Sequence, residues 1–82
     1  MKGFYLTASQ LSELREAHKK ARLSNAAAAY KINAVILLGT GWNFSKVKEA
    51  LLLDEETLRS YVSKFQEGGV TTLIHTNYIG GA

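Results

Sequence analysis

Residues 43–65 contain two short helical patterns with only Leu52 and Leu53 between them. In the first pattern, apolar residues recur at helical spacing behind Asn43, a residue type that favours the start of a helix. In the second, an apolar stripe follows Asp54, and the acids directly after it suit the positive end of a helix dipole. The stripe consists of Leu58, Tyr61, Val62 and Phe65. Two amphipathic helices joined by so short a corner are typical of a helix-turn-helix.

The sequence before this unit predicts two further helices. Thr7, with Gln10 three residues later, forms a capping box and predicts a helix from residue 8 to about residue 22. Residues 24–25 (Ser-Asn) precede four alanines and a broad apolar stripe, which predict a central helix over residues 26–40. We therefore expect an all-α fold, a small homeodomain-like helix-turn-helix bundle of about four helices.

Glycines divide the predicted helices from one another. Gly41 is suited to the left-handed end of the central helix, and Trp42 is expected to pack back over that junction as a core residue. The glycine pair at residues 68–69 is expected to end the last helix by the same mechanism. The prediction is a helix-turn-helix domain over residues 1–69 and an irregular, extended tail or linker over residues 70–82. A tail of this kind suggests a piece of something longer.

Composition limits the class of protein. With 82 residues and 46% hydrophobic residues, the chain is expected to form one small globular domain. The absence of cysteine excludes disulfides and thiolate zinc sites and suits a reducing compartment. The longest apolar run, residues 34–38, is far shorter than the ~20 residues of a membrane span, and the N-terminus lacks a signal-peptide pattern. We expect a soluble, cytoplasmic protein with no membrane partner.

The net charge of +3 is unevenly spread along the chain. Residues 1–41 carry six basic and two acidic residues, whereas residues 42–82 carry four basic and five acidic residues. A mildly basic domain suits a polyanionic partner, although an ordinary solvated surface explains the charge about as well.

No catalytic constellation is found in the sequence. Residues 39–41 (Gly-Thr-Gly) lack the lysine and the spacing of a phosphate-binding loop, and there is no nucleophile elbow. The adjacent acids Asp54, Glu55 and Glu56 suit a helix cap and dipole better than a metal site. We expect no enzymatic activity, no cofactor, no metal and no small-molecule substrate.

The polar face of the second helix in residues 43–65 is the candidate DNA-reading surface. Its members, which lie opposite the apolar stripe, are Glu56, Arg59, Ser60 and Ser63. Arg59 is the best candidate base reader, with guanine as its expected partner. The basic residues expected to hold phosphates are Lys19, Lys20, Arg22, Lys31, Lys46 and Lys64. For the first three, favourable pairing with a helix C-terminus is an equal alternative.

Short sequences within residues 30–74 also match a known pattern. They are an Ile-Leu-Leu run, the dipeptide Gly41-Trp42, Asn43 in the place of a usual serine cap, Thr57-Leu58, and the ending FQEGG over residues 65–69. On these residues the chain resembles the N-terminal helix-turn-helix of bacterial insertion-sequence transposases in the mariner-like superfamily. The resemblance implies a module that binds the terminal inverted repeats of a mobile element, in duplex DNA at the bacterial nucleoid. The family's nuclease site, a trio of acids on an RNase H-like fold, has no counterpart in this sequence.

Three features depart from that family pattern. Lys48 stands where a small residue usually lies between the two helices, so its side chain must extend outward. Leu52 replaces the usual turn glycine, so the turn is expected to do without an easy positive φ. Glu55 and Glu56 replace basic or polar residues, which costs affinity for phosphates or narrows the choice of base sequence.

Two other classes of function stay open at this point. The alanine-rich second helix and the acidic start of the last helix would suit a protein-interaction module, including a homodimer. The same fold would also suit a transcription regulator or an antitoxin-like protein, because a fold does not fix a function.

Overall fold

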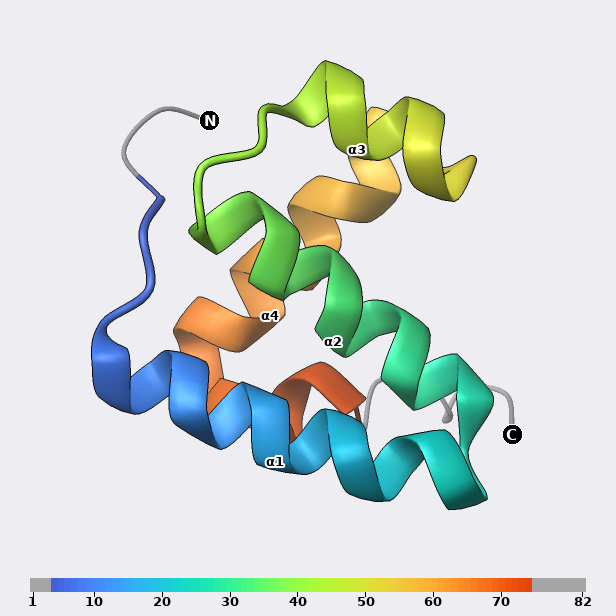
Figure 1. Ribbon diagram of the computed structural model, residues 1–82. Helices are drawn as coiled ribbons and strands as arrows, with labels where there is room; N and C mark the ends of the chain where they lie inside the picture. The colour runs from blue at the N-terminus through green and yellow to red at the C-terminus, as the bar shows by residue number, and fades with distance from the viewer. Residues whose placement is uncertain (1–3, 75–82) are drawn as a thin grey trace.

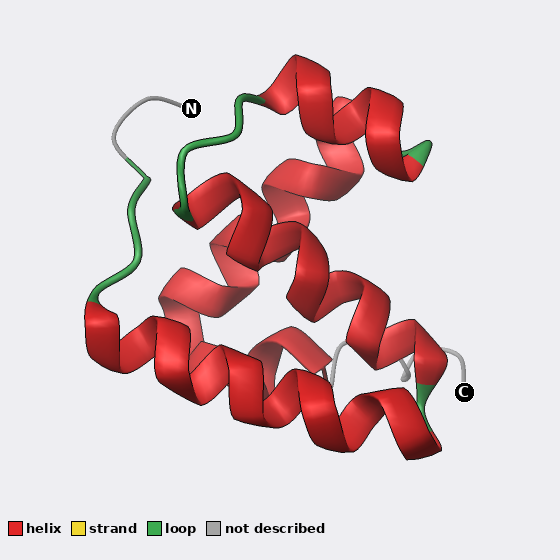
Figure 2. Cartoon of the chain, in the orientation of Figure 1, coloured by secondary structure: helices red, strands yellow, loops and turns green. Residues whose placement is uncertain are grey.

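The computed structural model describes residues 4–74, and over that range the chain forms four helices and no strand (Figures 1 and 2). They are α1 (Ala8–Ser24), α2 (Ala26–Gly39), α3 (Phe44–Leu51) and α4 (Glu55–Ile74). The all-α bundle expected from the sequence is confirmed. None of these four helices combines the length and the apolar character that a membrane crossing requires.

Every helix begins at the residue that the sequence predicts. The Thr7 hydroxyl accepts a hydrogen bond from the Gln10 backbone N–H at 3.1 Å, and the Gln10 side chain accepts one from the Thr7 N–H at 2.9 Å. Asn25, Asn43 and Asp54 each accept a hydrogen bond from the backbone N–H three residues later, at 3.2, 2.8 and 2.8 Å. Because these bonds satisfy backbone donors that lack an intrahelical partner, they fix where each helix starts.

Helix α2 is the centre of the bundle and contacts α1, α3 and α4 (Figure 1). Its side chains Ile32 and Val35 are completely buried. The apolar stripe of α4 packs into the same core, where Leu58 and Val62 are also completely buried. This burial fixes how α4 is rotated about its axis, and therefore which of its residues face solvent.

The segment before α1 is tied to the core at two points. The Phe4 ring meets the Phe65 ring edge to face, with the ring centres 6.5 Å apart. The Leu6 backbone N–H donates a hydrogen bond to the Gly39 carbonyl at 3.2 Å. The N-terminal segment thereby holds the end of α2 and the middle of α4 together.

The last five described residues differ from the expected extended tail. Residues 70–74 are helical, and Leu73 is completely buried in the core. The chain does break at Gly69, whose backbone is not helical (φ 78°, ψ −159°), and the segment beyond it returns towards α1 (Figure 1). Burial of Leu73 in the core outweighs the preference of its β-branched neighbours for an extended chain. The rest of the expected tail, residues 75–82, lies outside the described residues.

The two junctions around α3 also differ from expectation. Trp42 was expected in the core but is 44% exposed, although its backbone N–H donates to the Leu37 carbonyl at 3.1 Å at the end of α2, after the positive φ of Gly41 (114°). In the corner between α3 and α4, Leu52 takes a left-handed conformation (φ 58°, ψ 45°) with its side chain 88% exposed. The corner therefore has a positive φ although it lacks the glycine that adopts one easily. A leucine enters that region at a cost of about 1–2 kcal/mol.

Candidate nucleic-acid interface

The side of α4 that faces away from the core is open to solvent. Glu56, Arg59 and Ser63 are exposed, and Ser60 at the edge of this face is half-buried. We call these four residues the reading face. The opposite side of the helix is buried in the core, so these are the α4 side chains that face solvent over this stretch.

Arg59 does not stand alone on the reading face. Its Nη2 lies 2.6 Å from Oε2 of Glu55, one helical turn earlier, and its Nε donates to the same oxygen at 3.1 Å. Both side chains remain about half exposed, at 59% for Arg59 and 47% for Glu55. The hydrogen bond and the charge of Arg59 hold the pKa of Glu55 below its ordinary value, so the carboxylate is ionised at neutral pH.

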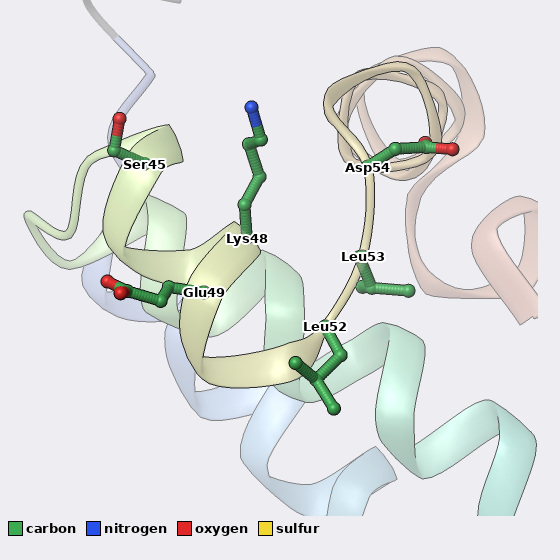
Figure 3. A pocket seen from close by; sticks show the side chains of 6 residues that line it. All are labelled: Ser45, Lys48, Glu49, Leu52, Leu53 and Asp54. Carbon is green, nitrogen blue, oxygen red and sulfur yellow. The ribbon is translucent and has the colours of Figure 1, made fainter.

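Lys48 offsets part of the acidity at the start of α4. Figure 3 shows its side chain extending away from the body of α3 beside the open hollow between α3 and α4, as expected for a lysine in this place. The pKa of Asp54 is lowered by its hydrogen bonds with Thr57 and, to a smaller degree, by the Lys48 charge. The Lys48 charge also contributes to the lowered pKa of Glu55. The acids here act in a helix cap and in ion pairing.

The structure brings Lys31 of α2 and Lys64 of α4 near each other, and both are half-buried. Burial lowers the pKa of Lys31, and the positive charge of Lys64 lowers it further. A phosphate placed near both ammonium groups would relieve this repulsion. These two predicted phosphate ligands therefore form a pair on the flank of α4.

The remaining basic candidates lie in two other places. Lys46 is exposed in the first turn of α3, next to the half-exposed Trp42. Lys19, Lys20 and Arg22 are exposed near the end of α1, on the side of the molecule away from α3 (Figure 1). Helices α1 and α3 do not touch one another in the described part of the chain. The α1 cluster is therefore not brought beside the reading face.

The sequence reasoning missed two residues that belong with the reading face. Glu55 was assigned to the helix dipole and to an effect on phosphate affinity or sequence choice, but not to Arg59, although its spacing of four residues from Arg59 is the usual spacing of a helical ion pair. Gln66 is exposed on α4 seven residues after Arg59, and its amide can both donate and accept hydrogen bonds. The same helical periodicity that identified Ser63 would have included it.

Within residues 4–74, no three acidic or histidine side chains gather in a way that could hold a metal ion. The hollow between α3 and α4 is shallow and open, and it is lined by Ser45, Lys48, Glu49, Leu52, Leu53 and Asp54 (Figure 3). Its walls hold one lysine and two carboxylates. The geometry favours contact with a surface over enclosure of a small molecule.

Comparison of the chain with protein-family models, with curated proteins and with solved structures finds no match. The resemblance of residues 30–74 to transposase helix-turn-helix modules thus depends on the short sequence matches alone. The fold class is established independently of it, by the four helices and their packing.

Proposed function

We propose that this chain is a sequence-specific duplex-DNA-binding domain that uses α3 and α4 as a helix-turn-helix. One observation carries the proposal: the side of α4 opposite its buried stripe exposes Arg59 and Ser63 to solvent. The major groove of B-DNA is wide enough to admit an α-helix, and base pairs are distinguished by the donors and acceptors at its floor. A long helix with exposed polar side chains on one face suits that groove.

The residues of the reading face and the basic residues around it have separate proposed roles. Arg59 would donate to guanine, Glu56 would accept from the amino group of cytosine, and the two serines would bond to either kind of base. Lys46 on α3 and the pair of Lys31 and Lys64 would bind phosphates on either side of the groove, which positions the protein without selecting sequence. The α1 cluster of Lys19, Lys20 and Arg22 would reach only phosphates outside the segment under α4.

The resemblance described above supports a narrower form of the proposal. The chain would then be the terminal-repeat-binding domain of a transposase of the mariner-like superfamily, acting on the bacterial chromosome in the cytoplasm. In that role it binds DNA without catalysing a reaction, and the chemistry belongs to a separate nuclease domain. A transcription regulator with the same helices would use the same face on a different DNA site.

The alternative of a dimerisation module has one observation in its favour, the exposed apolar side chains Leu23 and Leu52 (86% and 88%). The alanines of α2 give it less support than the sequence suggested. Ala28, Ala29 and Ala34 are buried in the chain's own core and are not available to a second copy, whereas Ala26 and Ala27 in the first turn are exposed. A homodimer would have to form through other surfaces.

A selection from a random pool of duplexes tests the main proposal. We expect the chain to enrich one sequence, with an affinity that falls steeply as salt is added because bound phosphates release counterions. Arg59→Ala should cost about 1–3 kcal/mol of binding free energy at that sequence and relax the preference at one base pair. Sedimentation in the same buffer separates the alternative. A stable dimer that enriches no duplex would contradict DNA binding and favour dimerisation.

A further inference from the structure

The Glu55–Arg59 pair leaves one particular edge of the guanidinium group free. Glu55 Oε2 accepts from Nε and from Nη2, which together form the side edge of the arginine head group. The end edge, which carries hydrogens on Nη1 and Nη2, has no partner within residues 4–74. This end edge is a planar fork of two parallel donors.

We infer that Glu55 is a positioning residue that fixes Arg59 so that its end edge reads guanine, an inference that rests on the DNA binding proposed above. Guanine presents O6 and N7 side by side in the major groove, and an arginine fork bonds to both at once. An arginine on an exposed helix otherwise samples many rotamers and loses that freedom on binding. The carboxylate of Glu55 restricts the rotamers before the DNA arrives.

The Glu55–Arg59 pair lowers the affinity for every duplex but raises the preference for guanine under Arg59. A carboxylate near the DNA backbone weakens binding to every sequence through repulsion of phosphates, and Lys48 offsets only part of this charge. Glu55 therefore disfavours duplexes in general, while it favours those with guanine under Arg59. Removal of its carboxylate should raise the affinity for duplexes in general and lower the preference for guanine. Loss of helix stability alone would not change these two quantities in opposite directions.

Glu67 provides a matched control, because it is exposed on the same helix, carries the same charge and has no proposed contact with DNA. It makes no ion pair with Arg59 in the described part of the chain. Substitution of Glu67 changes the net charge by the same amount as substitution of Glu55, but leaves the hold on the guanidinium intact. Glu55→Gln is a second control, since its amide oxygen can still accept from Arg59.

The experiment measures binding of the wild type, Glu55→Ala, Glu55→Gln and Glu67→Ala to the selected duplex and to duplexes that replace the guanine under Arg59. Glu55→Ala should lower the preference for guanine by about threefold or more while binding to unrelated duplex stays equal or becomes tighter. Glu55→Gln should restore part of the preference. Glu67→Ala should leave the preference at the wild-type level, and an NMR signal of the Arg59 Nε–H should shift only in the two Glu55 variants.

Two other results would overturn the inference in distinguishable ways. If Glu55→Ala keeps the full preference for guanine, Glu55 does not position Arg59, and DNA binding by the reading face still stands. If the wild type enriches no duplex at all, the proposed function fails, and the positioning role fails with it.

Discussion

The Leu6 side chain occupies the space that a side chain on Gly39 would need. A Cβ atom built on Gly39 would lie 2.3 Å from Cγ of Leu6, far inside van der Waals contact, and the backbones of the two residues are joined by a 3.2 Å hydrogen bond. The N-terminal segment can approach the end of α2 this closely because residue 39 has no side chain. That contact, with the Phe4–Phe65 pair beside it, anchors the segment before α1 onto the bundle.

Gly39→Ala should destabilise the fold, because the added methyl group forces Leu6 out of its position. We expect a loss of about 1–3 kcal/mol in the free energy of unfolding, measured by urea denaturation. The same substitution in a Leu6→Ala background should cost clearly less, since the space is then vacated. Equal costs in both backgrounds would show that the close contact is not the cause.

Leu52→Gly should stabilise the protein. The left-handed conformation at residue 52 is strained for leucine and free for glycine, and little apolar burial is lost because the side chain is 88% exposed. Glycine also gives the unfolded chain more entropy, which offsets part of the relieved strain. The free energy of unfolding should therefore rise by a net amount of about 0.5–1 kcal/mol, which corresponds to a few degrees in Tm. Leu53→Gly, at a half-buried neighbour without positive φ, should lower Tm. A lower Tm for Leu52→Gly would rule out this account of the corner.

Leu73→Ala should unfold much of the population, since it removes a completely buried side chain from the core. The expected cost is about 2–5 kcal/mol, read from urea denaturation. Thr71→Ala, two residues earlier and exposed, is the control and should change stability little. If the two variants were equally stable, residues 70–74 would be a tail as the sequence suggested, without a part in the core.

Lys64→Met should have opposite effects on folding and on DNA binding. The methionine keeps an apolar stem but removes the charge that lowers the pKa of Lys31, so the pKa of Lys31 should rise towards its ordinary value and the free protein should be slightly more stable. On DNA, one phosphate contact is lost, which should reduce the slope of log affinity against log salt by about 1. Arg15→Met, at an exposed basic residue of α1 with no proposed contact with DNA, should leave the slope unchanged. An unchanged slope for Lys64→Met would remove Lys64 from the interface.

The reading face could be predicted from the sequence because one helix carries all of it. Leu58 and Val62 recur at helical spacing, so the residues opposite them had to lie together once the helix formed. The pair of Lys31 and Lys64 could not be predicted as a pair. Its members are on different helices, and their approach depends on how α2 and α4 pack.

The sequence by itself determined where each helix begins, because every N-cap bonds to a backbone group only three residues away. The tertiary structure alone decided that Trp42 is half-exposed, that Leu52 has a positive φ and that Leu73 is completely buried. Leu73, for example, is buried only because the segment beyond the break at Gly69 returns to a core made by distant residues. The capping hydrogen bonds depend only on residues that are close together in the sequence, whereas the burial of a side chain depends on what the rest of the fold places around it.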